Sequence, residues 1–244
     1  MGPGTQVEVC GVWDAASEVR PADLSVGVVH LWKRALPASA KGMESCFDLL
    51  SIEEREKALR YRIERPRAEF IVTRSTLRSL IARYLDTSAQ EVSFGYTEFG
   101  RPVLNGLGAL HFNVSHTDGL ALMAFARDHE VGVDVEKFRP TSDIPGLADR
   151  FFSAQERDAL KPLSGDDLLA AFFRCWTRKE AYIKAKGEGL SLPLHQFDVS
   201  LAPNDNDALL ATRPDPSEVN RWTLCDVPID PGYAAALAIG VKTT

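Results

Sequence analysis

A helix start that occurs twice, about half a chain apart, constrains the fold more than any other pattern in the sequence. Ser51 is followed three residues later by Glu54, and Ser153 is followed three residues later by Glu156. Serine and glutamate at this spacing form a capping box, in which each side chain accepts a hydrogen bond from the other residue's backbone N–H. Two such starts in a chain of 244 residues suggest two related halves.

The elements predicted around the two starts follow one order. Similar helix starts also arise by chance, so this order carries the argument. In the first half, hydrophobic periodicity and turn residues predict a strand at 26–32, a helix from Ser51 to Tyr61, a longer helix opened by Pro66, and strands at 92–96, 111–114 and 120–125. In the second half they predict a strand at 131–135, a helix from Ser153, a long helix at 167–186, and strands at 197–201, 222–227 and 234–241.

This order favours an α+β fold with two pseudo-symmetric lobes in one chain. We place the N-terminal lobe at 1–127 and the C-terminal lobe at 128–244. The C-terminal lobe contains the acidic residues that are described below as candidate metal ligands. Binding sites often lie at the interface between such halves. The sequence therefore predicts an active site in the cleft between the lobes.

Composition excludes several classes of function. The net charge of −6 argues against a nucleic-acid partner held by overall electrostatics. No apolar stretch approaches the roughly 20 residues that cross a bilayer, and the N-terminus lacks a signal-peptide pattern. The cysteines are scattered without metal or redox spacing, which argues against zinc and favours a cytoplasmic enzyme. They are Cys10, Cys46, Cys175 and Cys225, and we interpret Cys175 as a packing residue rather than a nucleophile.

The first chemical pattern is a strand with two acidic residues, Gly132-Val133-Asp134-Val135-Glu136. Alternate residues of a strand point to one face, so Asp134 and Glu136 project together while the valines face the core. Two adjacent carboxylates repel each other, and a divalent cation such as Mg²⁺ removes that repulsion. The alternative is a solvated strand face at the edge of a sheet.

The second pattern lies on the long helix of the second half. Residues four apart stack on a helix, which places Trp176, Glu180 and Lys184 on one face. Glu180 would add a third carboxylate to the metal site, and Lys184 would hold a phosphate. The alternative is an ordinary Glu–Lys pair on a helix surface, although the aromatic neighbours Phe172 and Phe173 disfavour it.

The third pattern is Phe112-Asn113-Val114-Ser115-His116-Thr117, which we place at the end of a strand. Adjacent serine and histidine are not a catalytic pair by themselves, because nucleophile and base usually come from distant positions. A loop with hydroxyls, an imidazole and backbone N–H groups suits a phosphate contact. The alternative is a turn with a surface histidine.

With these segments in place, the sequence resembles the surfactin-synthetase-activating type of 4′-phosphopantetheinyl transferase, the monomeric two-lobed class. Order and spacing fit from about Ser51 to the C-terminus. Five separated motifs in register are specific, whereas Gly-x-Asp-x-Glu alone is not. The motifs are Gly100-Arg101-Pro102, Phe112-Asn113-Val114-Ser115-His116, Gly132-Val133-Asp134-Val135-Glu136, Phe151-Phe152-Ser153 with Glu156, and Trp176-Thr177-Arg178-Lys179-Glu180-Ala181-Tyr182-Ile183-Lys184 before Gly187-Glu188-Gly189-Leu190.

The resemblance implies the 4′-phosphopantetheinyl transferase fold and holo-acyl-carrier-protein synthase activity. Such an enzyme moves the phosphopantetheine group of coenzyme A onto a serine of an apo acyl or peptidyl carrier protein and releases 3′,5′-ADP. The implied cofactor is Mg²⁺, with Mn²⁺ as an alternative, and coenzyme A is the substrate. The implied partners are carrier proteins, without nucleic acid or membrane, and two lobes in one chain favour a monomer.

The resemblance also assigns roles to residues of this chain. It implies that Asp134, Glu136 and Glu180 bind the metal, that Glu180 or Glu156 takes the serine proton directly or through a water, and that Lys184 contacts the phosphates. It implies that Ser115 and His116 hold the nucleotide end with its 3′-phosphate. The remaining residues assigned to coenzyme A are Arg101, Lys57 and Lys179.

The sequence departs from the family pattern at one position. Glu69 stands before Phe70, where the family usually has an arginine that touches the nucleotide. An acidic residue beside a phosphate is unfavourable, so Arg67 or Arg74 is expected to replace the missing contact. The carrier protein, which is acidic, is expected to dock on a local apolar and basic patch, with Phe138-Arg139-Pro140 as a candidate.

Two other functions remain open from the residues themselves. A magnesium-dependent phosphohydrolase or nucleotidyl transferase would use the same carboxylates without the Ser115–His116 segment. A non-catalytic relative would only bind coenzyme A or carrier proteins, which the complete set of acidic residues and Lys184 disfavours. The carrier proteins used, the acceptance of acyl-coenzyme A and the preferred metal do not follow from the sequence.

Overall fold

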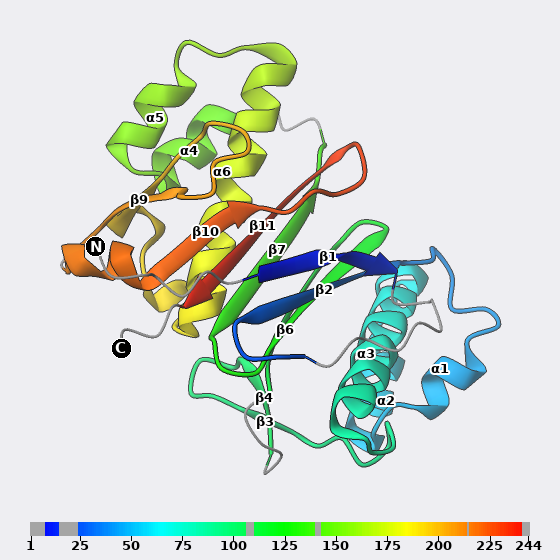
Figure 1. Cartoon of the computed structure of the whole chain (residues 1–244). Coiled ribbons are helices and arrows are strands. Elements are labelled where there is room, and N and C mark those ends of the chain that lie inside the picture. The colour runs from blue at the N-terminus through cyan, green and yellow to red at the C-terminus, as the bar shows by residue number, and fades with distance from the viewer. Residues whose placement is uncertain (1–7, 15–23, 106–109, 140–142, 214, 241–244) are drawn as a thin grey trace.

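The two halves of the chain form two lobes, each with a β-sheet and helices on its outer side (Figure 1). This architecture comes from a computed structural model, which describes residues 8–14, 24–105, 110–139, 143–213 and 215–240. The expected α+β class with two lobes is confirmed.

The N-terminal lobe contains a four-stranded sheet in the order β1-β2-β6-β5, in which β1 and β2 are parallel and the other neighbours antiparallel. A small hairpin, β3-β4, stands beside it. The elements of this lobe are β1 (Glu8–Asp14), β2 (Val28–Ala35), α1 (Glu44–Asp48), α2 (Ile52–Arg60), α3 (Glu64–Leu85), β3 (Phe94–Tyr96), β4 (Pro102–Leu104), β5 (His111–Thr117) and β6 (Leu120–Ala126).

The C-terminal lobe contains an antiparallel sheet in the order β10-β11-β7 and a second small hairpin, β8-β9. Its elements are β7 (Val131–Lys137), α4 (Ile144–Phe151), α5 (Ala154–Leu160), α6 (Gly165–Lys186), the short 3₁₀ helices η1 (Gly189–Ser191), η2 (Leu194–Gln196) and η3 (Pro216–Arg221), and the strands β8 (Phe197–Val199), β9 (Leu209–Thr212), β10 (Trp222–Asp226) and β11 (Tyr233–Gly240).

Both predicted capping boxes are confirmed. Ser51 Oγ accepts from the Glu54 backbone N–H at 3.3 Å, and a Glu54 carboxylate oxygen accepts from the Ser51 N–H at 2.9 Å. The same pair of bonds joins Ser153 and Glu156, at 3.3 and 2.8 Å. The two lobes therefore start α2 and α5 by the same local mechanism, which satisfies backbone donors at each helix N-terminus.

Three of the four buried apolar clusters in the described part of the chain form layers against the two sheets. In the N-terminal lobe, α3 packs on one face of the sheet through Leu80 against Trp32 and Phe125. In the C-terminal lobe, α6 packs on its sheet around Tyr182. The third layer lies between the two sheets and joins the lobes. It contains Leu31, Leu122, Val133 and Leu237 with their neighbours.

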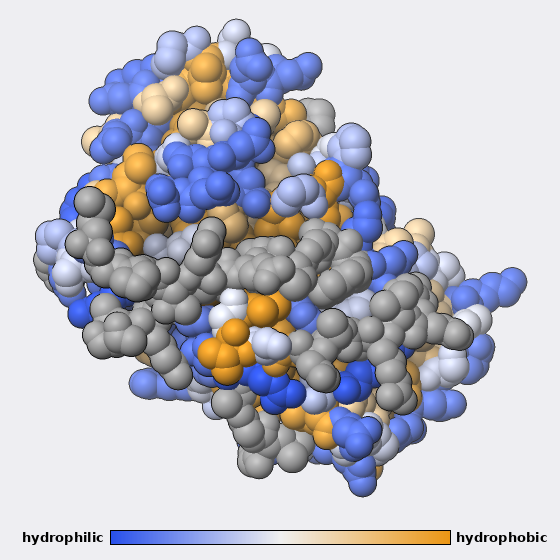
Figure 2. Space-filling model, in the orientation of Figure 1, coloured by the Kyte–Doolittle hydropathy of each residue, from blue (hydrophilic) through white to orange (hydrophobic). Residues whose placement is uncertain are grey.

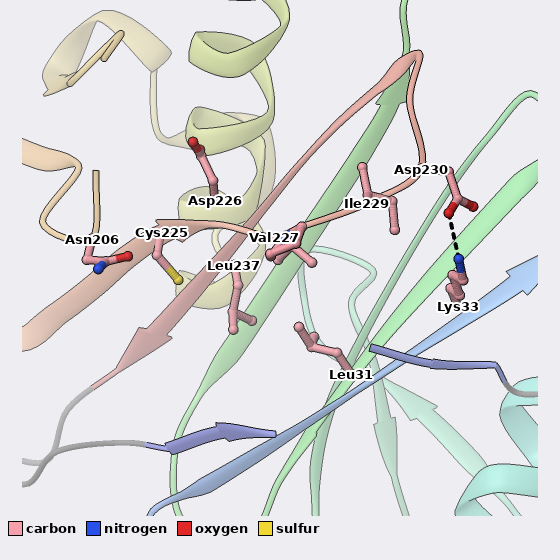
Figure 3. Close-up of a pocket in the computed structure, with 10 residues that line it drawn as sticks. Leu31, Lys33, Asn206, Cys225, Asp226, Val227, Ile229, Asp230 and Leu237 are labelled. Atoms are coloured by element: carbon pink, nitrogen blue, oxygen red, sulfur yellow. Dashed lines mark hydrogen bonds and ion pairs between the residues drawn. The ribbon is translucent and has the colours of Figure 1, made fainter. Parts of the chain in front are cut away.

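β6 shows the consequence of this layering, because all seven of its residues are buried. A strand that is covered on both faces has a continuous apolar sequence, whereas a strand with one solvated face alternates apolar and polar residues. The lobes also meet at the protein surface, where Lys33 on β2 and Asp230 after β10 form an ion pair at 2.7 Å (Figure 3). On the coloured parts of the face in Figure 2, hydrophilic and hydrophobic areas alternate on both lobes.

The structure differs from the sequence prediction in several elements. β1, β4, β9, α1 and α4 were not predicted, since each is short or lacks a clear hydrophobic period. β5 continues to Thr117, so Ser115 and His116 belong to the strand and not to a loop after it. Within the described ranges, none of the helices has the length and hydrophobicity needed to span a bilayer.

Candidate active site

The candidate site forms where β5 of the N-terminal lobe, β7 and α6 come together. Gly132 on β7 permits this approach. A Cβ at Gly132 would lie 2.1 Å from the backbone oxygen of Ala181 and 2.3 Å from the backbone nitrogen of Ala185 on α6. Glycine is therefore required for close contact between strand and helix, which brings the acidic residues of β7 next to the polar side chains of α6.

Asp134 is the buried centre of the site, with a relative exposure of 3%. Its Oδ1 accepts from Lys184 Nζ at 2.6 Å and from Ser115 Oγ at 2.7 Å. Its Oδ2 is buried and has no hydrogen-bond partner within the described segments. The predicted residues Asp134, Lys184 and Ser115 thus meet from three different elements, and one carboxylate oxygen of Asp134 is available for a further ligand.

Glu136 and Glu180 are partly buried beside Asp134. Desolvation, followed by the negative charge of Asp134, raises the pKa of Glu136, while a hydrogen bond from Thr117 Oγ1 at 3.1 Å opposes this shift. Desolvation and then the charge of Asp134 also raise the pKa of Glu180, with Lys184 acting in the opposite direction. The three carboxylates therefore interact electrostatically, and Lys184 provides part of the compensating charge.

These side chains fit a hard divalent cation. Carboxylate oxygens are the ligands that Mg²⁺ takes, and the buried Oδ2 of Asp134 lacks any other partner. The part of the chain that the structure describes contains no three acidic, histidine or cysteine side chains already converged as a ligand set. Lys184 Nζ pairs with Asp134 Oδ1 at 2.6 Å and is the counter-charge of this carboxylate in the structure.

The polar side chains of β5 form a seam between the lobes. Asn113, Ser115 and Thr117 alternate along the strand and share one face. Asn113 Oδ1 accepts from the Val133 N–H at 3.0 Å, and Thr117 Oγ1 accepts from the Lys137 N–H at 3.3 Å. Asn113 and Thr117 belong to the polar segment singled out in the sequence, but their contacts with β7 were not predicted, although the alternation Asn-x-Ser-x-Thr was visible.

His116 points to the opposite face of β5 from Ser115 because neighbouring strand residues alternate. Desolvation lowers the pKa of His116, and the nearby carboxylate of Glu69 on α3 opposes that shift. Glu69 also accepts a hydrogen bond from Arg65 at 3.1 Å. Ser115 therefore belongs to the carboxylate site, whereas His116 lies on the side of α3 with the unusual Glu69.

Arg101 lies between the β3-β4 hairpin and the C-terminal lobe. It donates to the Ala185 carbonyl at 3.0 Å and pairs with Glu130 at 2.8 Å. It also lines a cavity of about 470 Å³ together with His111 and Lys186. The predicted basic residue thus borders a hollow next to the end of α6, with its cationic group partly neutralised by Glu130.

The remaining predicted basic residues lie on α2 and α3. Lys57 is exposed, and its Nζ lies 5.1 Å from the centre of the Phe70 ring. Arg74 is already paired with Glu54 at 3.1 Å and lies over the Phe94 ring, so it is a poor replacement for the missing arginine. Arg67 has a buried Nε that lacks a hydrogen-bond partner among the residues that the structure describes, so its guanidinium is less committed than that of Arg74.

Two of the predicted residues lie inside the C-terminal lobe, away from Asp134 and its contacts. Glu156 and Lys179 are fully buried and form an ion pair at 2.7 Å inside the C-terminal lobe. Glu156 also caps α5 and accepts from the Val199 N–H at 2.8 Å, and Lys179 donates to the carbonyls of Leu194 and Phe197. Their bonding capacity is used within the fold, so neither a proton-accepting role for Glu156 nor a coenzyme A contact for Lys179 is supported.

A sizeable cavity lies away from these residues. It measures about 670 Å³ and opens between β2 and the β10–β11 connection, next to Leu31, Val227 and the Lys33–Asp230 pair (Figure 3). None of the predicted metal or phosphate ligands lines it. The contacts of Asp134 with Lys184 and Ser115, and the influence of Asp134 on the pKa values of Glu136 and Glu180, identify the candidate site; cavity size does not.

Comparison with known proteins gives a consistent result. A family model described as the 4′-phosphopantetheinyl transferase superfamily matches residues 130–238, and a model of the N-terminal region of 4′-phosphopantetheinyl transferases matches residues 35–127. The transferase HetI of Nostoc sp. is 36% identical over 214 residues, 86% of this chain and 87% of HetI. The transferase Sfp of Bacillus subtilis is 31% identical over 202 residues, 82% of this chain and 87% of Sfp.

More distant similarity extends to an animal protein. An L-aminoadipate-semialdehyde dehydrogenase-phosphopantetheinyl transferase of Xenopus laevis is 26% identical over 214 residues, 80% of this chain and 70% of that protein. Both lobes are therefore matched, and the relatives above 30% identity are matched over most of their length. The chain belongs to the 4′-phosphopantetheinyl transferase superfamily and is an Sfp-type 4′-phosphopantetheinyl transferase that acts on carrier proteins.

Proposed function

We propose that this enzyme transfers the 4′-phosphopantetheine group of coenzyme A to a serine hydroxyl of an apo acyl or peptidyl carrier protein. The new bond joins the serine oxygen to the β-phosphorus, and the bond that breaks releases 3′,5′-ADP. The observation that carries this proposal is the contact of Asp134 with Lys184 and with Ser115 of the other lobe, close enough to Glu136 and Glu180 to raise the pKa of both carboxylates.

Asp134, Glu136 and Glu180 would hold Mg²⁺, with Mn²⁺ as the alternative. The bound ion would supply positive charge that offsets the negative charge of the pyrophosphate. Lys184 would leave Asp134 to contact a phosphate oxygen and stabilise charge on the leaving nucleotide. Ser115 Oγ lies 3.0 Å from Lys184 Nζ and would orient that lysine.

Glu180 is the remaining carboxylate for accepting the serine proton, directly or through a water. Glu156, the other carboxylate considered from the sequence, is enclosed in the C-terminal lobe. For the nucleotide end of coenzyme A we propose contacts to His116, Arg101 and Lys57, with Arg67 in place of the family arginine. This end of the site differs from the family pattern in Glu69, which stands near His116 where the family usually has an arginine.

We also propose that the enzyme acts as a monomer in the cytoplasm. Both sides of the proposed cleft come from one chain, which supports the monomer. Cys46, Cys175 and Cys225 are free thiols, and this supports a reducing compartment. Burial raises the pKa of Cys175 well above that of an ordinary thiol, which also agrees with a packing role for this residue.

The test is an intact-mass measurement of an apo carrier protein incubated with this enzyme, coenzyme A and Mg²⁺. We expect the carrier to gain one phosphopantetheine group, and we expect EDTA to prevent the gain. Consumption of coenzyme A without a carrier would instead support a hydrolase. Binding of coenzyme A without modification of any of several unrelated carriers would support a non-catalytic relative.

A further inference from the structure

Exposed apolar side chains gather at one place in the N-terminal lobe. Of the nine large apolar side chains that are exposed in the described part of the chain, four lie within residues 52–63. Three of them are in the segment 59–63, which contains the last two residues of α2 and the connection to α3 and which we call the α2–α3 corner. Their relative exposures are 61% for Leu59, 37% for Tyr61 and 68% for Ile63. Scattered exposed apolar residues are ordinary, but a contiguous group marks an interaction surface.

The way α2 packs on its neighbours explains why Ile52 and Leu59 face solvent. The buried side of this helix consists of Glu54 and Ala58, which face α1 and α3. Ile52 and Leu59 are seven residues apart and therefore lie on one stripe of the helix, away from that buried side. Ile52 is 75% exposed. α2 thus carries two exposed apolar side chains on its outward side, two turns apart with Arg55 and Glu56 between them, although its inner face is already packed.

Two arginines flank these apolar side chains. Arg60 and Arg62 are exposed, and neither has an ion-pair partner among the residues that the structure describes. Their neighbours differ, because Arg55 donates to the Leu50 and Asp48 carbonyls and Arg65 pairs with Glu69. Arginine and tyrosine beside aliphatic side chains are the residue types enriched in protein–protein interfaces.

The α2–α3 corner adjoins the proposed nucleotide end of the active site. The ring centre of Tyr61 lies 5.6 Å from that of Phe70, which also lies under Lys57. Arg65, at the start of α3, pairs with Asp118 in the turn between β5 and β6. Glu69, one turn further along α3, lies close enough to His116 to influence its pKa. A protein bound at the corner would therefore stand beside the active site.

We propose that the α2–α3 corner is a docking surface for the acidic helical face of the carrier protein, an inference that rests on the proposed function. The enzyme carries a net charge of −6, so the overall field repels an acidic partner. Local attraction must overcome this repulsion. Arg60 and Arg62 supply positive charge that guides the encounter, and Leu59 and Ile63 supply apolar anchors that slow dissociation.

The experiment compares the steady-state kinetics of Arg60→Glu, Arg62→Glu and the double variant with those of the wild-type enzyme. For the double variant, we expect the KM for the carrier protein to rise about tenfold or more, since losing even one steering charge pair typically has a large effect on association. The kcat and the KM for coenzyme A should stay within about twofold of wild type. Raising the salt concentration should reduce the difference between the enzymes because it screens the exposed charges.

Arg83→Glu is the matched control. Arg83 is also an exposed arginine in the last turn of a helix of the same lobe, and its replacement changes the net charge equally. It lies at the far end of α3, about 30 Å from Arg62 at 1.5 Å per helical residue. We expect the Arg83→Glu enzyme to keep the wild-type KM for the carrier. Leu59→Ser should raise this KM without changing its salt dependence.

Three outcomes would overturn the proposal. The first is an unchanged KM for the carrier in the double variant. The second is an equal rise with Arg83→Glu, which would indicate a general charge effect. The third is a rise in the KM for coenzyme A alone, which would assign the arginines to the nucleotide. Absence of transfer by the wild-type enzyme would contradict the proposed function itself, so the two failures are distinguishable. Circular dichroism melts verify that the variants are folded.

Discussion

The two carboxylate oxygens of Asp134 have different environments, and the proposed chemistry depends on this difference. One of its oxygens receives hydrogen bonds from Lys184 and Ser115, and the other is buried without a partner. An unpaired buried carboxylate oxygen is costly, since desolvation is not repaid by a hydrogen bond. A ligand bound to this oxygen would stabilise the site, and a divalent cation such as Mg²⁺ binds carboxylate oxygens.

Replacing Asp134 or Lys184 by alanine should therefore abolish measurable transfer. Removing one preorganised charge from a phosphoryl-transfer site typically costs at least about a hundredfold in kcat. The measurement is the rate of carrier modification at saturating coenzyme A, together with a thermal melt. Near wild-type kcat in either variant would contradict the site assignment. If activity is lost together with a strongly lowered Tm, Asp134→Asn is the variant to measure, because it keeps the side-chain volume and removes the charge.

The contact between Lys184 and Asp134 also predicts that Lys184 weakens metal binding and strengthens coenzyme A binding. In the structure its Nζ is the counter-charge of Asp134, so a cation at that carboxylate competes with the lysine. We expect Lys184→Met to bind Mn²⁺ alone about tenfold more tightly than wild type, as followed by electron paramagnetic resonance of the free ion. The same variant should bind coenzyme A more weakly by calorimetry. Unchanged Mn²⁺ affinity would show that Lys184 does not compete for Asp134.

At the scale of elements, the site depends on the close contact between β7 and α6. The spacing of Asp134 and Glu136 on a strand, and of Glu180 and Lys184 on a helix, was visible in the sequence. The distance between these two elements was not. It is set by Gly132, which leaves room for the backbone of Ala181 and Ala185 on the helix.

Gly132→Ala should therefore disturb the site while leaving every polar residue in place. The added methyl group meets helix backbone, which moves less readily than a flexible side chain, so we expect a loss of about 1–3 kcal/mol in the free energy of unfolding. We also expect kcat to fall, since the carboxylates of β7 move away from α6. Chemical denaturation and transfer kinetics measure the two effects. Wild-type values for both would mean that α6 does not pack on Gly132.

The buried pair of Glu156 and Lys179 allows a direct test of structural against catalytic roles. Glu156→Gln leaves the Lys179 charge without its partner inside the C-terminal lobe, which typically costs about 3–5 kcal/mol of stability. We expect a marked drop in the denaturation midpoint but an unchanged kcat per folded enzyme molecule below the unfolding transition. A large fall in kcat with retained stability would restore Glu156 as a candidate proton acceptor.

At the scale of the whole molecule, the lobes are joined by an apolar layer between their sheets and by the polar seam of β5 on β7. β6 lies against this layer and is buried along its whole length. The same layering places Ser115 of the first lobe on Asp134 of the second. Neither lobe alone contains the proposed site, because Ser115 and Asp134 belong to different sheets.

Because one chain supplies both lobes, we expect the active enzyme to be a monomer of 26.8 kDa. Sedimentation equilibrium over a wide concentration range, with and without coenzyme A, measures the mass. Activity per mole of enzyme should not change on dilution. A concentration-dependent dimer whose activity falls as it dissociates would contradict this prediction and would place part of the site at a subunit interface.

The sequence by itself determined the features that depend on local spacing. Capping boxes need two residues three apart, and the shared faces of Asp134 with Glu136 and of Glu180 with Lys184 follow from strand and helix periods. The two-lobed α+β class also followed, through the repeated order of elements and the family motifs. The division at 127/128 and the roles of the individual site residues stay predictions.

Only the tertiary structure decided which polar groups share a site. Asp134 meets Ser115 and Lys184 although they are far apart in sequence, because sheet packing and Gly132 bring three elements together. Glu156 and Lys179 lie inside family motifs, yet packing buries them as a pair in the C-terminal lobe. Burial and pairing depend on which segments fold against each other, and residue spacing along one chain segment contains no information about that.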